Sequence, residues 1–167
     1  MKKLFFMLAL ILAVSWNVNA QTRSKSEFIA TATDEYGTCP HLAILFSCDI
    51  EYDDTTNLPN YSFWLGVQND KYECVEDFYT LIRGTAQEVY DFLNFVEIWG
   101  KNNKEDGISE KFENYDLRRH NFGALLGKHI SVYSGDKHHT FRDNEIKTMK
   151  KRLIKYCKKH NIVLTTE

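Results

Sequence analysis

The stretch TAQEVYDFLNFVEIWG, Thr85 to Gly100, decides the fold because it predicts a complete helix by itself. Thr85 and Glu88 form the pattern of a capping box, in which each side chain binds a free backbone N–H group at the helix start. Gly100 stands where a left-handed residue would end the helix. Apolar residues recur between them at helical spacing and define one face for burial, which consists of Val89, Phe92, Leu93, Val96 and Trp99.

The residues before this helix alternate between apolar and polar side chains, which is typical of β-strands. Residues 26–33 predict a first strand with Phe28 as its main apolar anchor. Residues 41–53 form the clearest strand, because one of its faces is wholly apolar. Residues 61–68 predict a third strand, and 71–83 predict the strand that returns beside it.

The chain after the helix adds further strands. Residues 108–117 predict another strand or an irregular stretch, and 129–133 with 138–141 predict a hairpin in which Tyr133 faces His138. Strands therefore come in runs, without a regular alternation of strand and helix. The sequence predicts an α+β fold, a largely antiparallel β-sheet with two amphipathic α-helices packed on one face.

A second start signal, Thr140 followed by Asp143, predicts a final helix that runs to about His160. Its apolar face consists of Ile146, Met149, Leu153 and Cys157. The opposite face is basic, whereas the rest of the chain is acidic, so it could bind an acidic protein or an anionic polymer. The alternative is a solvated face whose charges the helix dipole favours. This possible anionic-partner face consists of Lys147, Lys151, Arg152, Lys155, Lys158 and Lys159.

Nucleic acid is disfavoured as the partner of that helix, because no aromatic residue is interleaved with its basic side chains. An exported protein also seldom meets cellular DNA. Export is indicated by the first residues, where Lys2 and Lys3 precede the almost wholly apolar segment 4–14. We expect residues 1–20 to be a cleaved signal peptide of bacterial type, and residues 21–167 to form a single periplasmic or extracellular α+β domain.

A membrane anchor is the alternative interpretation of the first residues. Their apolar run falls well short of the ~20 residues that span a bilayer, so a signal peptide is favoured. No later segment is long and apolar enough to cross a membrane.

An even number of cysteines in an exported protein points to disulfide bonds. Three pairings are possible, and buried free thiols are the alternative. A zinc site is disfavoured because the chain contains no C-x-x-C motif. The disulfide candidates are Cys39, Cys48, Cys74 and Cys157.

Two smaller charged groups are interpreted as solvated surface. Asp49, Glu51, Asp53 and Asp54 could bind calcium, but the spacing of an EF-hand loop and its central glycine are absent. Residues 118–120, Arg-Arg-His, form a small basic group without a fixed geometry.

No linear motif of a nucleotide-binding, metalloprotease or serine-hydrolase site is present, so we assign no catalytic residue, cofactor or metal ligand. The leading hypothesis is an exported, non-enzymatic binding or interaction domain with a basic C-terminal helix. The alternative is a small secreted hydrolase acting on a cell-wall, glycan or peptide substrate. Its candidate residues would be His41, His129 or His138 with Asp49 or Glu51.

Overall fold

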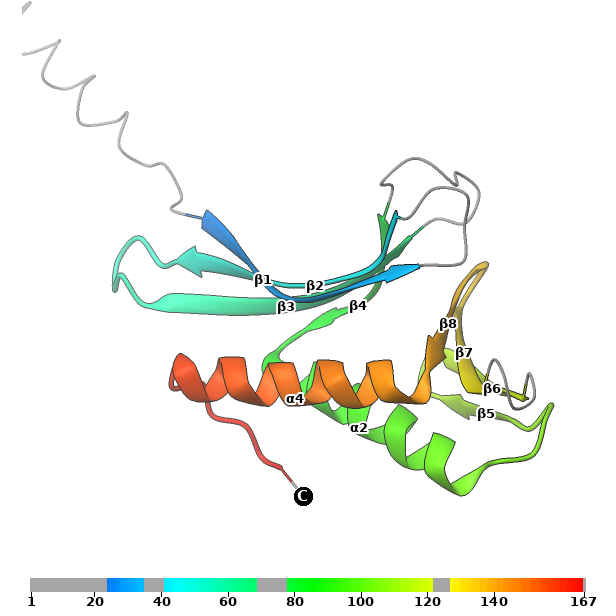
Figure 1. The fold of residues 1–167 in the computed structure, drawn as a ribbon. Helices are drawn as coiled ribbons and strands as arrows, with labels where there is room; N and C mark the ends of the chain where they lie inside the picture. Colours follow the sequence, from blue (N-terminus) through cyan, green and yellow to red (C-terminus); the bar gives the residue numbers. More distant parts are fainter. Residues whose placement is uncertain (1–23, 35–40, 69–77, 122–126, 167) are drawn as a thin grey trace, which may run out of the picture.

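The computed structural model describes residues 24–34, 41–68, 78–121 and 127–166. These residues form two four-stranded antiparallel sheets and two helices, which confirms the predicted α+β class (Figure 1). Sheet A contains β1 (Ser24–Asp34), β2 (His41–Tyr52), β3 (Pro59–Gln68) and β4 (Phe78–Gly84) and leads into α2 (Ala86–Asn102). Sheet B contains β5 (Ser109–Phe112), β6 (Tyr115–Asn121), β7 (Lys128–Ser134) and β8 (Lys137–Arg142) and leads into α4 (Asp143–Lys159).

The chain therefore runs twice through four strands and a helix, where the sequence predicted one sheet. The strands of each sheet pair in chain order, and α2 separates the two runs. Residues 108–117 were predicted as a strand or an irregular stretch, and all of them except Ile108 fall in β5, the turn after it and the start of β6. The predicted returning strand begins at Phe78 in the described chain, and residues 71–77 lie outside it.

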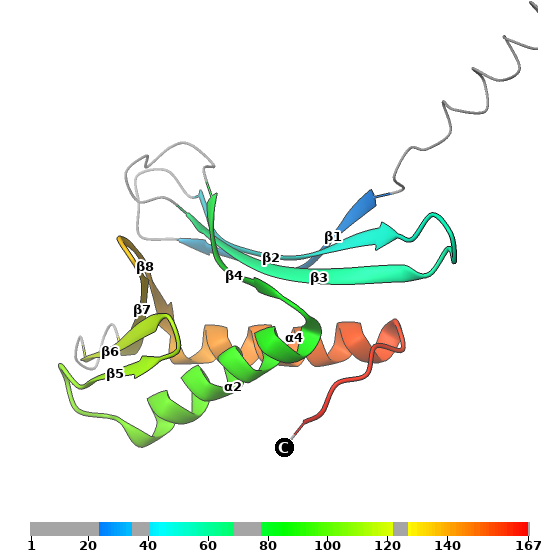
Figure 2. The same cartoon turned by 180° about the vertical axis from the view of Figure 1, so that it is seen from behind.

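Both helices lie on the same face of sheet A and leave the other face uncovered by any described helix or strand (Figures 1 and 2). Alternation along β2 explains which side chains meet the helices. Phe46, Cys48 and Ile50 are buried beneath the sheet, whereas Asp49 and Glu51 point to the opposite face. We call this opposite face the outer face of sheet A.

The capping box of α2 is present as predicted. The Thr85 N–H donates to Glu88 Oε2 at 2.7 Å, and the Glu88 N–H donates to Thr85 Oγ1 at 3.3 Å. The prediction that Gly100 ends the helix is wrong, because α2 continues to Asn102. A Cβ atom on Gly100 would lie 2.3 Å from Ile130 Cδ1, so this glycine instead permits close packing of α2 against β7.

The start of α4 also differs from the prediction. Thr140 lies in β8, where its hydroxyl is 2.6 Å from the hydroxyl of Ser131 on the neighbouring strand β7. The helix begins at Asp143, and Glu145 Oε2 accepts a hydrogen bond of 2.8 Å from the Arg142 N–H. The start of α4 is therefore capped by the side chain of Glu145, its third residue, and not by a Ser or Thr.

A hydrophobic cluster joins both sheets to both helices, and α2 packs against α4 within it. Phe92 of α2 packs on Tyr115 with ring centroids 4.8 Å apart, and Phe95 stacks on Phe112 at 4.1 Å. The Tyr115 hydroxyl then donates to the Leu81 carbonyl of sheet A at 3.2 Å. No helix in the described part of the chain is long and apolar enough to cross a membrane.

Phe28 is the clearest error among the predicted core residues. Its side chain is 73% exposed, because Phe28 and its register partner Ser47 lie on the outer face of sheet A, and cross-strand partners share a face. A β-bulge follows Phe28 in β1, so the pairing shifts before Ala30.

Candidate binding surfaces

The predicted anionic-partner face lies along the exposed side of α4. The buried residues of α4 fall on the opposite side of the helix, where they contact sheet A, sheet B and α2. All six members of the face are exposed: Lys147, Lys151, Arg152, Lys155, Lys158 and Lys159. We call these six residues the basic face.

No carboxylate of the described residues lies within ion-pair distance of any of these six side chains. Lys150, which turns inward on the same helix, shows the contrast. Its ammonium group forms an ion pair with Glu97 and donates to Asn94 Oδ1 at 2.9 Å. The acidic residues of α4 are confined to its first turn, so the basic face carries an uncompensated positive charge.

Glu97 of α2 pairs with Lys101 of the same helix and with Lys150 of α4. Burial acts to raise the pKa of Glu97, but its hydrogen bonds and ion pairs with Lys101 and Lys150 together lower it. Glu97 is therefore held ionised between the two helices, and Lys150 is unavailable to an external ligand.

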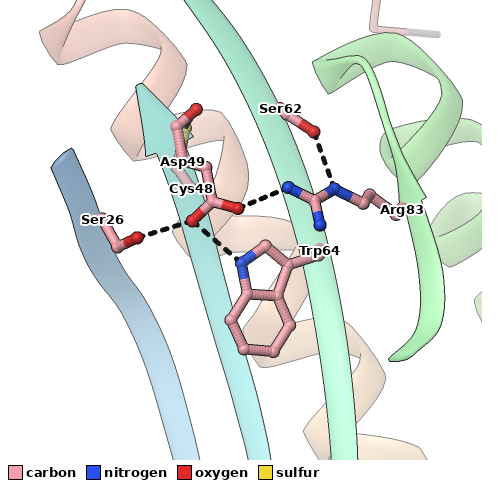
Figure 3. Close-up of polar contacts among 6 residues, drawn as sticks. All are labelled: Ser26, Cys48, Asp49, Ser62, Trp64 and Arg83. Atoms are coloured by element: carbon pink, nitrogen blue, oxygen red, sulfur yellow. Dashed lines mark hydrogen bonds and ion pairs between the residues drawn. The ribbon is translucent and has the colours of Figure 1, made fainter. Parts of the chain in front are cut away.

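A second polar group lies on the outer face of sheet A and is centred on Asp49 (Figure 3). Asp49 Oδ1 accepts from the Ser26 hydroxyl at 2.6 Å and from Trp64 Nε1–H at 3.2 Å. Asp49 Oδ2 accepts from Arg83 Nη2–H at 2.6 Å, and Arg83 Nε–H donates to the Ser62 hydroxyl at 3.2 Å. The cluster thus connects all four strands of sheet A.

The three predicted acidic neighbours of Asp49 have separate surroundings, and Asp54 is exposed after β2. Glu51 is exposed on β2, and Asp53 accepts hydrogen bonds from the backbone N–H groups of Thr55 and Thr56, which closes the turn before β3. These hydrogen bonds lower the pKa of Asp53. Among the described residues, no group of three or more His, Cys, Asp and Glu side chains is placed to hold a metal ion.

Cys48 and Cys157 are buried free thiols, which contradicts the expectation of a disulfide at these two positions. Burial raises the pKa of each thiol to about 11, so both are protonated at neutral pH and are poor nucleophiles. Neighbouring Tyr156 donates to Glu27 Oε2 at 3.0 Å and joins α4 to β1. The other two candidates, Cys39 and Cys74, lie outside the described residues.

The histidines of the alternative hydrolase lie apart from its carboxylates in the fold. His129 and His138 belong to sheet B, where the Tyr133 ring stacks on His138 at 5.1 Å as the predicted hairpin register requires. Asp49 and Glu51 belong to sheet A, and Asp49 is engaged by three donors there. His41 opens β2, but its side chain is outside what the structure describes.

A hollow of about 420 Å³ lies on sheet B, but its described lining contains no histidine. The hollow places acidic and basic side chains side by side, and Lys111 lies 3.6 Å from Asp116. Its described lining consists of Ser109, Glu110, Lys111, Asp116, Leu117, Arg118 and Tyr133.

Arg119 was predicted as surface and is instead almost completely buried, with 1% of its side chain exposed. Its guanidinium donates to both carboxylate oxygens of Asp143, at 2.6 and 2.8 Å. The alternation of β6 could have revealed this, because Leu117 and Arg119 share a face that is opposite to Arg118.

The Asp49 cluster was missed for a different reason. Asp49 and Trp64 were each placed on a strand, but their contact depends on the register between β2 and β3, which no local pattern gives.

No protein-family model matches this chain, and a search of curated proteins found no significant match.

Proposed function

We propose that this protein is an exported, non-enzymatic binding domain that holds an extended polyanion along the basic face of α4. The observation that carries this proposal is that six exposed cations share one helix side, with no carboxylate of the described residues in ion-pair distance. A purely solvated surface tends to intersperse charges of both signs.

The geometry of α4 favours a long ligand over a small one. Lys147 and Lys159 are separated by about 18 Å along the helix axis, because an α-helix rises 1.5 Å per residue. Lys147, Lys151 and Lys155 follow one another at intervals of one helical turn, so they form a row along the helix. A chain with regularly repeated negative charges can contact this row without entering a pocket.

The basic face is also held rigidly. The opposite side of α4 is buried in the core, and Lys150 ties the helix to Glu97 and Asn94 of α2. A ligand therefore orders flexible Lys and Arg side chains but no backbone, which reduces the free-energy cost of binding.

The test is binding to heparin, a sulfated glycan, and to polyglutamate, a carboxylate polypeptide, measured at several salt concentrations. We expect the affinity to fall steeply as salt rises, and Lys151→Glu combined with Lys155→Glu to weaken binding by about tenfold or more. Preference for one probe over the other would identify the chemistry of the natural polyanion as a glycan or an acidic protein.

A matched control separates this face from the overall charge. Lys104→Glu combined with Lys111→Glu changes the net charge by the same amount at exposed positions outside α4. We expect the control to alter the affinity by less than about threefold, a change within the range of weak surface electrostatics. An equal loss in both double variants would refute a specific role for α4.

The export part of the proposal rests on the first residues of the sequence. Lys2, Lys3 and the apolar segment 4–14 support cleavage before Gln21 and secretion to the periplasm or the medium. Cys39 and Cys74 remain the disulfide candidates, since Cys48 and Cys157 are free. Intact mass of the exported protein should correspond to a start at Gln21, with a loss of two hydrogens that reduction restores.

A further inference from the structure

The outer face of sheet A carries a row of four side chains that crosses all of its strands. The register aligns Phe28 of β1 with Ser47 of β2, Ser47 with Trp64 of β3, and Trp64 with Arg83 of β4. Neither α2 nor α4 covers this face, as Figures 1 and 2 show. Two aromatic rings and a guanidinium therefore stand in line on a surface that no described helix or strand covers.

The indole ring of Trp64 is fixed in a flat position on this surface. Its Nε1–H donates to Asp49 Oδ1 at 3.2 Å, as drawn in Figure 3. Its six-membered ring lies over Gly66, because a Cβ atom at Gly66 would be 2.6 Å from Trp64 Cζ3. The glycine thus makes room for the ring, and the hydrogen bond sets its orientation before any ligand arrives.

The polar groups beside the ring retain unused hydrogen-bonding capacity. A carboxylate offers about four acceptor positions, and Asp49 uses three of them for Ser26, Trp64 and Arg83. A guanidinium has five N–H donors, and Arg83 uses two for Asp49 and Ser62. Because the Arg83 side chain is 53% exposed, its remaining donors can reach a ligand.

A buried hydroxyl without a described hydrogen-bond partner lies between the two aromatic residues in this row. Ser47 is completely buried, and its hydroxyl has no hydrogen-bond partner among the described residues. Such groups carry a free-energy cost that calls for an explanation. A ligand hydroxyl that enters between Phe28 and Trp64 would satisfy it, and Phe28 is exposed enough to move aside.

The pairing of the edge strands β1 and β4 is irregular beside Trp64. A β-bulge follows Phe28 in β1, and a second register shift occurs between β3 and β4 at Leu65 and Gly66. Bulges re-aim side chains and are frequent beside functional sites. Both irregularities flank the Trp64 ring.

We infer that the outer face of sheet A binds a neutral pyranose unit of a glycan. One face of a sugar ring presents C–H groups, which suit the negatively charged face of an indole. Its hydroxyl groups both donate and accept, which matches the free acceptor position of Asp49 and the free donors of Arg83. A neutral sugar fits best because Asp49 already compensates the charge of Arg83, and Glu51 on the same face would repel an acidic one.

Cellotetraose, chitotetraose and maltotetraose are suitable probes, and isothermal titration calorimetry measures their binding to the purified protein. We expect at least one of them to bind and to change the fluorescence of Trp64, because Trp99 is buried in the core. Trp64→Ala and Arg83→Gln should each weaken that binding by about tenfold, the loss expected for a stacked ring or a charged hydrogen bond.

Leu58→Ala is the matched control, since Leu58 is an exposed apolar residue in the turn that precedes β3. We expect it to leave the sugar affinity unchanged, and circular dichroism checks that every variant is folded. The double variant Lys151→Glu with Lys155→Glu should also bind the sugar normally, which separates this site from the basic face of α4.

Two results would overturn the inference. One is that none of the three oligosaccharides binds the folded protein. The other is that Trp64→Ala and Arg83→Gln retain the affinity of Leu58→Ala. If sedimentation instead shows a dimer that Phe28→Ala dissociates, the outer face is an interface between two copies of this chain, and the sugar assignment is wrong.

Discussion

The guanidinium of Arg119 joins β6 to the first residue of α4 and has almost no contact with water. Both carboxylate oxygens of Asp143 accept hydrogen bonds from it. Asp143 itself is about half exposed, with 49% of its side chain accessible. The pair therefore compensates a buried cation with a carboxylate at the surface, and loss of the carboxylate leaves that cation uncompensated.

Asp143→Ala should lower the free energy of unfolding by about 1–3 kcal/mol, the usual cost of a buried polar group that loses its partner. Urea denaturation at neutral pH measures this. Asp116→Ala is the control, because Asp116 pairs with Lys111 at 3.6 Å on the surface, and such pairs contribute about 0–1 kcal/mol. Equal losses in the two variants would mean that Arg119 needs no carboxylate.

The double variant Arg119→Met with Asp143→Ala distinguishes a buried-charge penalty from a helix-start effect. If the loss in Asp143→Ala comes from an unpaired cation, removal of Arg119 as well should recover part of it, because an apolar residue of similar length can replace the buried charge. No recovery would assign the loss to the first turn of α4.

At the scale of elements, α2 is held by the apolar side chains that its sequence periodicity identified. Phe92 is 1% exposed and packs on Tyr115 of β6. Phe92→Ala should therefore lower the free energy of unfolding by about 3–5 kcal/mol, as large-to-small substitutions in cores do. Thermal or urea denaturation of the variant tests this prediction.

Ile98→Ala is the matched control on the same helix, since Ile98 is 46% exposed. Its cost should stay below about 1 kcal/mol, as for substitutions near the surface. A melting temperature of Phe92→Ala that equals that of Ile98→Ala would show that α2 does not dock through Phe92.

Local sequence signals were sufficient to locate both helices and the β7–β8 hairpin, but not to fix every helix end. The capping box set the start of α2, and a turn at Gly135 set the pairing of Tyr133 with His138. The end of α2 was mispredicted because Gly100 serves the contact with Ile130 of β7, which is a partner distant in sequence. Helix ends decided by tertiary packing leave no local signal.

The two candidate binding surfaces also differ in whether the sequence could predict them. The basic face of α4 follows from the helical period alone, so sequence reasoning located all six of its residues. The Asp49 cluster needs three strand registers to bring Ser26, Trp64 and Arg83 together. Register depends on how whole strands pair across a sheet, so no pattern within one strand could have predicted the cluster.

At the scale of the whole molecule, the burial of Cys48 and Cys157 predicts their chemical behaviour. Burial leaves them inaccessible and raises the pKa of both thiols to about 11. We expect iodoacetamide at neutral pH to leave both unlabelled in the folded protein and to label both in denaturant without reductant. Peptide mass mapping gives the result for each cysteine.

Two outcomes of this mapping would contradict the structure. Labelling of Cys48 or Cys157 in the folded protein would show that the core beneath sheet A is open. A failure of both to react in denaturant until reductant is added would show that both are held in disulfide bonds. Prior unfolding of a reduced sample provides the positive control for complete labelling.

The order of strands within the two sheets has a consequence for how the chain folds. Within each sheet, every described strand pairs with its neighbours in sequence, so each sheet can form from contacts that are close in sequence, at a small entropic cost. The first strand and the last helix are different, because Tyr156 of α4 reaches Glu27 of β1 across most of the chain. Because α4 follows every described strand in the sequence, it is synthesised after them and closes the core that begins with β1. A nascent chain that has not yet produced α4 carries exposed apolar surface on both sheets and depends on α4 to become stable.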